Sequence, residues 1–480
     1  MSAAEGNSGR ATRRPGSTRR NLKAAQQSGQ PITETTKAST ATERYVALLH
    51  ADRIDAAEDQ LRQHGIEFGT LEPFALTDGK ALAQPSLPSA RGQLLRRLGV
   101  AVLDLPPNMA SMLKLASGPE RPIRSLRPQR VFRRGIRHAD PDAATSASLG
   151  SKPGILHPDY LRGYQDGVAD LAARVSAALP LAAVHYDAIK AQAYSEGEIA
   201  WGLQAIRADA SHYTGTGVKV AILDSGIDSA HPDLKPSVVA AQSFVASDPV
   251  PDDHWGHGTY CAGLVCGPVH PARLPRYGVA PGVALYVAKV IDQDRNSQEY
   301  EILTALEWAM TQGCTIVSMS IGQPVASYDS DFETVADRAL AQGVLLVAAA
   351  GNESKRPSSI VPVDYPANCP SVMAVGAVGT DLRVASFSNA GLVPDGGQVD
   401  IAAPGVDIWS TWKGGTYLKD SGTSPAVPFV TGCLALLAEA HPGVTGRALW
   451  QLLTQNAMRL ADGSRDVGIG LVQAPCTGGN

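Results

Sequence analysis

The chain has 480 residues, 44% of them hydrophobic and 18% charged, which is enough to bury a sizeable core in about two to four domains. Its 47 glycines and 33 prolines are too few for a collagen-like or low-complexity chain. The sequence has no uninterrupted apolar run of about 18 residues, which argues against a membrane span. The net charge of −4 is unevenly distributed: residues 1–40 hold seven Lys or Arg and two Glu, and residues 91–137 hold eleven basic and two acidic residues. The rest of the chain is therefore acidic.

Residues 1–42 are rich in Ser, Thr, Gly, Gln and Arg and have no hydrophobic period, which predicts a disordered basic tail. The run Thr18–Lys23 resembles a twin-arginine export signal, but residues 24–36 supply no apolar segment. We therefore expect a cytoplasmic protein. No aromatic residues interleave the basic ones, so we expect neither a nucleic acid nor a membrane as partner.

The next segment, residues 43–134, predicts a small α+β domain. Its patterns indicate the order strand, helix, strand, strand, helix, strand, at residues 45–49, 55–63, 66–76, 98–105, 107–115 and 129–132. This β-α-β-β-α-β order describes a ferredoxin-like unit.

Residues 135–197 predict a connector that is partly helical, because apolar residues recur at three- and four-residue steps between Tyr160 and Leu179. From residue 198 to 475 the chain alternates apolar runs such as VKVAIL, ALYVAKVI and VLLVAAA with helical patterns. That alternation predicts an α/β domain with a parallel sheet flanked by helices, followed by a short tail at 476–480.

The six cysteines do not form a disulfide framework in a chain of this length. Cys261 and Cys266 lack a second pair at zinc-like spacing. We expect mostly buried free thiols at Cys261, Cys266, Cys314, Cys369, Cys433 and Cys476.

Three islands of sequence carry residues suited to catalysis. An apolar strand ends at Asp224 in VKVAILDSGID, His257 lies in DHWGHGT, and Ser424 lies in SGTSPAVP before an apolar helix. Asp, His and Ser in this order, each flanked by Gly, fit a nucleophilic triad.

This constellation resembles the subtilisin-like (subtilase) family of serine peptidases over residues 198–475. The resemblance implies that Ser424 is the nucleophile, that His257 is the general base and that Asp224 orients the imidazole. Asn352, in the segment AAAGNE, resembles the asparagine of the family's oxyanion hole, although a Gly-Asn loop is also an ordinary turn. The resemblance further implies substrate-binding segments at Ser320, Ile321, Gly322, Ala350 and Gly351.

Asp364 precedes Tyr365-Pro366, in the segment that forms the floor of the S1 pocket in subtilisins. A carboxylate there favours Arg or Lys at P1 by charge pairing, against the alternative of an aspartate that faces solvent. The segment between Gly267 and Gly278 lacks the Asn-rich loop of the family's tight calcium site. We therefore expect no metal site and no cofactor, with calcium as the alternative that stays open.

The unit 43–134 resembles the inhibitory propeptides of this family, which implies an intramolecular inhibitor; the alternative is a retained accessory domain. Arg133, Arg134 and Arg137 are candidate self-cleavage points if the basic P1 preference holds. The whole chain is thus expected to be a serine endopeptidase acting through an acyl-enzyme on protein or peptide substrates, with a narrow substrate range. The alternative is an inactive subtilisin-like scaffold that binds a protein.

Overall fold

The computed structural model describes residues 42–69, 92–132, 197–273, 275–325, 327–393 and 397–476. The predicted basic tail up to residue 41 and the predicted connector up to residue 196 lie outside these residues. So do the candidate cleavage points Arg133, Arg134 and Arg137.

The small domain contains one mainly antiparallel sheet in the order β2-β3-β4-β1-β5, with two helices. Its elements are β1 (Glu43–Leu49), α1 (Ile54–Gln63), β2 (Phe68–Gly69), β3 (Gly92–Leu95), β4 (Val100–Leu105), α2 (Pro107–Leu115) and β5 (Ile123–Pro128). The prediction that residues 129–132 close this sheet was wrong, because β5 takes that place beside β1. The following strand, β6 (Val131–Phe132), pairs instead with β10 (Ser297–Gln298) of the larger domain.

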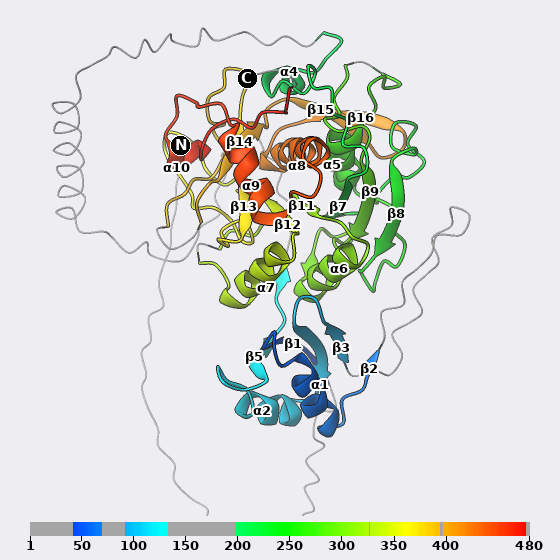
Figure 1. Ribbon diagram of the computed structural model, residues 1–480, viewed down its shortest axis with the longest axis vertical. Coiled ribbons are helices and arrows are strands. Elements are labelled where there is room, and N and C mark those ends of the chain that lie inside the picture. The colour runs from blue at the N-terminus through cyan, green and yellow to red at the C-terminus, as the bar shows by residue number, and fades with distance from the viewer. Residues whose placement is uncertain are drawn as a thin grey trace, which may run out of the picture. The chain divides into compact units, whose positions relative to one another are not determined.

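The larger domain is built on a seven-stranded parallel sheet in the order β14-β13-β12-β11-β7-β9-β8, with helices packed against it (Figure 1). Its strands are β7 (Lys219–Asp224), β8 (Val238–Ser243), β9 (Ala284–Lys289), β11 (Ile316–Met319), β12 (Leu345–Ala349), β13 (Val372–Val378) and β14 (Ile401–Pro404). The remaining elements are α4 (Trp201–Ala205), α5 (His257–Cys266), α6 (Glu299–Thr311), α7 (Ser330–Ala341), β15 (Ile408–Trp412), β16 (Thr416–Asp420), α8 (Thr423–Ala440), α9 (Gly446–Gln455) and α10 (Ser464–Val467). The predicted α/β class is confirmed.

Alternation along β7 shows how the sheet divides two hydrophobic cores. Val220 and Ile222 belong to the core that contains side chains of α5, α8 and α9. Ala221 and Leu223 belong to the core that contains side chains of α6 and α7. Successive side chains of a strand point to opposite faces, so a strand buried on both faces reads as a continuous apolar run.

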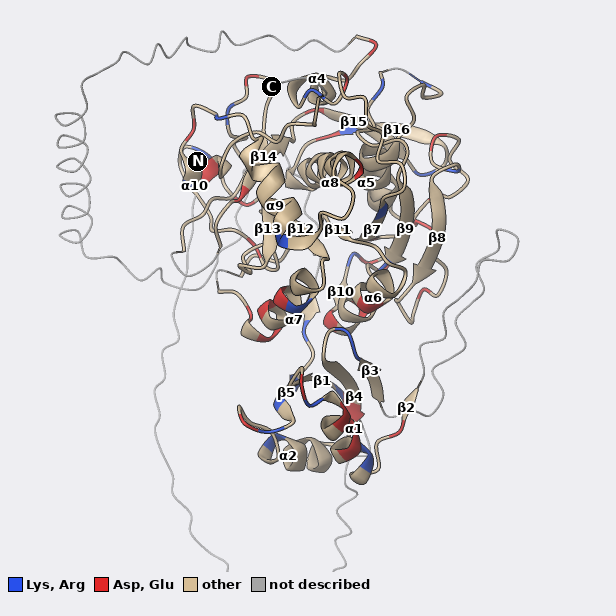
Figure 2. Ribbon diagram, in the orientation of Figure 1, with Lys and Arg blue, Asp and Glu red and all other residues tan. Residues whose placement is uncertain are grey.

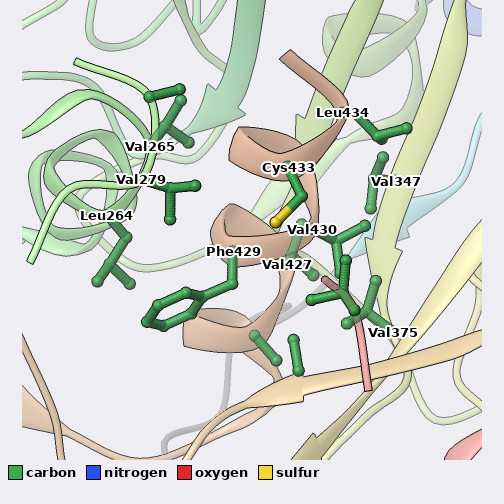
Figure 3. Close-up of a cluster of buried hydrophobic side chains, with 14 of the residues drawn as sticks. Leu264, Val265, Val279, Val347, Val375, Val427, Phe429, Val430, Cys433 and Leu434 are labelled. Atoms are coloured by element: carbon green, nitrogen blue, oxygen red, sulfur yellow. The ribbon is translucent and has the colours of Figure 1, made fainter. Parts of the chain in front are cut away.

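Helix α8 is the central element of the first core, and side chains from α5 and from the sheet strands surround it (Figure 3). By length and composition α8 could cross a membrane, since its mean hydropathy is 1.3, but 83% of that stretch is buried inside the domain. Its apolar character is therefore accounted for by packing. All six cysteines are free, and five of them are buried, as predicted.

The sheet of the small domain also buries both of its faces. Ala47 and Leu49 of β1 pack in a core with α1 and α2. Val46 and Leu48, on the opposite face, belong to the same hydrophobic cluster as the buried residues of α6 and α7. The small domain thus shares a continuous apolar interface with the larger one.

Candidate active site

Asp224 and His257 meet where β7 ends and α5 begins. His257 Nδ1 lies 2.8 Å from Asp224 Oδ1 and 2.9 Å from Oδ2, and both side chains are buried. An ionised carboxylate can only accept, so Nδ1 carries the proton and donates it to Asp224, which leaves Nε2 unprotonated in the neutral ring. The two residues have the geometry of the orienting pair of a nucleophilic triad.

A close backbone contact between Gly226 and Gly258 brings these two elements together. A Cβ on Gly258 would lie 2.2 Å from the carbonyl oxygen of Gly226, and Gly226 has a φ of +113°. Both positions therefore require glycine.

The buried carboxylate of Asp253 holds the same junction in place. It accepts hydrogen bonds from the Ser225 hydroxyl at 2.9 Å, from the Gly256 N–H at 2.6 Å and from the Thr259 hydroxyl at 2.7 Å. The Ser225 hydroxyl in turn accepts the Gly258 N–H at 2.9 Å. Asp253 therefore ties the end of β7 to the first turn of α5, on which His257 lies.

Burial and the charge of Asp224 act in opposite directions on the pKa of His257. Burial by itself lowers the pKa of the imidazole, but the negative charge of Asp224 outweighs it, and the pKa is raised well above its usual value. The indole of Trp255 stacks on the imidazole, with centroids 4.9 Å apart and planes 16° apart. The guanidinium of Arg295 lies 4.4 Å above the Trp255 ring. Sequence reasoning missed both contacts, although Trp255 lies inside the histidine motif.

Ser424 is the second residue of α8 and is buried. The Ser320 hydroxyl donates to the Ser424 carbonyl oxygen at 2.9 Å, and Ser424 Oγ lies 3.5 Å from the Ser320 carbonyl oxygen. Helices α5 and α8 pack against each other, and Cys261 Sγ of α5 lies 3.7 Å from His257 Nδ1. The structure thus brings Ser424 to the predicted substrate segment that begins at Ser320.

Asn352 follows β12 and is anchored through its side-chain oxygen. Oδ1 accepts hydrogen bonds from the Thr423 N–H at 2.8 Å and from the Thr423 hydroxyl at 2.9 Å. These two donors fix the orientation of the amide, so Nδ2 is its donor end. A Cβ on Gly422 would lie 3.5 Å from Nδ2 and 3.6 Å from the Ser424 nitrogen, which places both donors near one point.

Asp364 is 3% exposed and lies between the two predicted substrate-binding segments. A Cβ on Gly351 would lie 2.7 Å from Asp364 Oδ2, and a Cβ on Gly322 would lie 3.2 Å from the same atom. Asn389 Nδ2 donates to Asp364 Oδ1 at 3.1 Å and to Glu353 Oε2 at 2.9 Å. The carboxylate is therefore buried beside two glycines, and the alternative that it faces solvent is wrong. Asn389 had no recognisable motif in the sequence.

Ligand atoms of Asp224, His257 and Cys261 lie within 4.8 Å of one another and could hold a metal ion. Burial raises the pKa of the Cys261 thiol, and a protonated thiol is a poor metal ligand. Since His257 Nδ1 already donates to Asp224, the arrangement fits a hydrogen-bonded pair better than a metal centre.

Comparison with known proteins agrees with this geometry. Residues 215–471 match the model of the subtilase family of peptidases. The chain is 41% identical over 268 residues to subtilisin E of Bacillus subtilis, covering 55% of this chain and 67% of that protein. It is also 41% identical to subtilisin of Bacillus pumilus, covering 92% of that protein. Among solved structures, sphericase matches with a TM-score of 0.52 and 29% identity, over 58% of this chain and 99% of that one.

Proposed function

Because the chain belongs to the subtilase family and is a subtilisin-like serine endopeptidase, we propose that it cleaves peptide bonds through a triad of Ser424, His257 and Asp224. The observation that carries the proposal is the buried hydrogen bond from His257 to Asp224, on a helix that packs against the helix of Ser424. The proposed reaction needs no cofactor.

In this reaction His257 Nε2 takes the proton of Ser424 Oγ as the oxygen attacks the carbonyl carbon of the scissile bond. The proton is then given to the leaving amine, and the peptide's acyl group remains bound to Ser424 as an ester. Water, deprotonated by the same imidazole, hydrolyses that ester and restores the hydroxyl. Asp224 keeps the proton on Nδ1 and stabilises the imidazolium that forms at each step.

The anchored amide of Asn352 supports an oxyanion hole. Its Nδ2 and the Ser424 N–H would both donate to the oxygen that becomes negative in the tetrahedral intermediate. Such donors stabilise the transition state more than the ground state when they are held rigidly, and Thr423 holds this amide by two hydrogen bonds.

The position of Asp364 supports a preference for Arg or Lys at P1. A P1 side chain that enters between the segments of Gly322 and Gly351 would reach a buried carboxylate with a second carboxylate, Glu353, bridged to it by Asn389. The two carboxylates make this region negative, and a charge-assisted pair with Asp364 favours a basic side chain over an apolar one.

The interface of the small domain supports its proposed role as an intramolecular inhibitor. Arg127 donates to Glu299 at 2.6 and 2.7 Å and to Asp331 at 3.1 Å. Arg338 of α7 donates to the carbonyl oxygens of Leu49 and Leu98, at 2.6 and 2.8 Å. These contacts and the shared apolar cluster hold the small domain against the larger one. In this position β6 pairs with β10.

Labelling with a fluorophosphonate tests the triad directly. We expect the full-length protein to be labelled at Ser424 once it hydrolyses peptide substrates, and the Ser424→Ala variant to be neither labelled nor active. An unlabelled wild-type protein that also fails to hydrolyse peptides would instead favour the inactive, protein-binding scaffold.

Sequencing of the N-terminus tests the role of the small domain. If the domain is removed by self-cleavage, wild type acquires a new N-terminus after residue 132 and Ser424→Ala keeps the original one. Processing that persists in Ser424→Ala would rule out self-cleavage, and an active protein that keeps residues 43–132 bound would support a retained accessory domain.

A further inference from the structure

A short segment of the chain, Arg130–Phe132, lies along β10 of the larger domain. Val131 pairs with Gln298 and Phe132 with Ser297 in an antiparallel register. Phe132 also borders a small pocket with Ile321 and Gly322, the residues that follow Ser320 and its contacts to Ser424. A peptide held in this way is bound as an added strand, and its alternate side chains are read by the surface below.

Two side chains of this segment face the larger domain, and the one between them does not. Phe132 is 4% exposed and stacks on Tyr365, with centroids 5.5 Å apart and planes 7° apart. The guanidinium of Arg130 lies 5.6 Å from the centroid of the same Tyr365 ring. Val131 is 47% exposed. The surface therefore contacts the first and third residues of the sequence Arg-Val-Phe.

The Arg130 guanidinium pairs with Asp329, the N-cap residue of α7. The two carboxylate oxygens of Asp329 contact different groups. Oδ1 accepts the N–H groups of Asp331 and Phe332, both at 2.8 Å, and lies 3.5 Å from Arg127 Nη2, whereas Oδ2 is the atom that contacts Arg130. A carboxylate is not required for the cap, since asparagine caps helices equally well. The negative charge of Asp329 is required for the ion pair with the Arg130 guanidinium.

A second carboxylate, Glu299 at the start of α6, adds to the negative charge around Arg130. Figure 2 shows acidic residues on both α6 and α7. Glu299 accepts the Arg130 N–H at 3.1 Å, and its own N–H donates to the Arg130 carbonyl oxygen at 3.0 Å. The side chains of Glu299 and Asp329 are 1% and 6% exposed. Departure of the small domain would remove Arg127 and Arg130 together and leave both carboxylates without these cations, which favours a new cation from a substrate.

We propose that the larger domain selects substrates with an arginine two residues before the residue that binds beside Tyr365, upstream of the scissile bond. This inference rests on the proposed endopeptidase function and names its substrate class. Asp329 binds the arginine side chain, Glu299 accepts the arginine's backbone N–H, the pocket beside Tyr365 holds the aromatic ring, and β10 supplies backbone hydrogen bonds. The segment 130–132 is the chain's own copy of that sequence and occupies the site.

Kinetics with matched peptides test this selection in the full-length protein. The substrates are internally quenched peptides with one cleavable segment preceded by Arg-Val-Phe, Ala-Val-Phe or Arg-Val-Ala. A short reporter that lacks the upstream residues normalises for the amount of active enzyme. Replacing Arg or Phe by Ala should each lower kcat/KM about tenfold, mainly through KM, because a charge-assisted hydrogen bond or a buried ring is lost.

Two variants separate the Arg130 contact from the Arg127 contacts of the small domain, since Asp329 and Asp331 both contact Arg127 and only Asp329 contacts Arg130. Asp329→Asn keeps the helix cap and removes the charge. The ratio of kcat/KM for the Arg-Val-Phe peptide to kcat/KM for the Ala-Val-Phe peptide should therefore fall below about twofold. Asp331→Asn is the matched control, because Asp331 contacts Ser125 and Arg127 of the small domain but not Arg130, and it should keep the wild-type ratio. A wild-type ratio near one, or equal ratios in wild type and Asp329→Asn, would overturn the proposal.

A binding measurement distinguishes failure of this inference from failure of the proposed function. In full-length Ser424→Ala, an excess of Arg-Val-Phe peptide should displace residues 130–132 and speed their amide hydrogen exchange, whereas an Ala-Val-Phe peptide should do so much less. If no form hydrolyses the reporter, the endopeptidase proposal fails, and this exchange experiment still decides the subsite. Equal exchange with both peptides would refute the subsite even in an active enzyme.

Discussion

The indole of Trp255 lies parallel to the imidazole of His257, with ring centroids 4.9 Å apart. Trp255 precedes the first turn of α5 by two residues, so the residue that fixes the plane of the candidate base belongs to the same motif. The stack covers a face of the imidazole, and Asp224 holds Nδ1 at its edge.

We predict that Trp255→Ala lowers kcat by up to about tenfold and that Trp255→Phe recovers most of the loss, because an aromatic pair contributes about 0.5–1.5 kcal/mol. Burial by itself lowers the pKa of His257, so removing the indole should also shift the acid limb of the kcat profile to higher pH. An unchanged kcat with an unchanged acid limb would show that the stack does not position His257.

The pKa of His257 predicts how activity depends on pH. The general base must be neutral, and Asp224 raises its pKa well above 6.5 despite burial, so kcat/KM should rise with pH through a midpoint above 6.5. Asp224→Asn removes that charge and should move the midpoint to lower pH while lowering kcat by about 10⁴, the size typical of such triads. A pH profile with a midpoint at or below 6.5 in wild type would contradict the account.

Substrates that differ at P1 test the role of Asp364. We expect kcat/KM for P1 Arg to exceed that for P1 Leu or Phe by about tenfold or more, since a charge-assisted pair is worth about 1.5–3 kcal/mol. Asp364→Asn retains an acceptor for Asn389 and should abolish most of this preference. Glu353→Gln serves as the matched variant on the other side of Asn389 and should have the smaller effect. Equal turnover of the three substrates, or a preference for Leu, would refute the assignment.

Glu301 predicts a pH dependence of stability that is separate from catalysis. Its Oε2 accepts the Gln298 N–H at 2.7 Å in the capping box of α6, and burial raises its pKa to about 8. The folded state therefore binds a proton more tightly than the unfolded state, so the free energy of unfolding should fall as pH rises from about 5 to about 8. The variant Glu301→Gln keeps the acceptor and cannot ionise, so it should lack this fall.

Thermal unfolding at about pH 5 and about pH 8 measures this effect, with every variant in a Ser424→Ala background to prevent self-digestion. Glu301→Ala is the control for the cap and should be about 1 kcal/mol less stable than Glu301→Gln at both pH values, since neither side chain ionises. Parallel stability curves for the chain with Glu301 and for the Glu301→Gln variant would show that the carboxyl does not titrate in this range.

The sequence was informative wherever structure or chemistry is encoded locally. The strands β7, β9, β11, β12 and β13 are apolar runs in the sequence. Asp224 and His257 lie in short motifs, Asp224 at the end of β7 and His257 at the start of α5. The helix 107–115 was predicted with the bounds that the structure has, because a proline begins it.

Features that depend on distant parts of the chain could not be predicted. Residues 129–132 have the pattern of a strand, but nothing local indicates that Val131 and Phe132 pair with β10 rather than with β1. β8 and β14 are the two edge strands of the large sheet, and both lack a long apolar run. The bridge from Asp364 through Asn389 to Glu353 joins three loops, so no spacing in the sequence reveals it.

The most direct test of the account is whether Ser424 becomes acylated during turnover. An activated ester of a short peptide acid, for which deacylation is the slower step, is mixed with the full-length protein and the reaction is stopped in acid within the first turnover. Mass measurement of the intact chain and of its peptides should find one acyl group per active chain, located on Ser424 and absent from Ser424→Ala. Hydrolysis without acylation, or an acyl group on any other residue, would contradict the account.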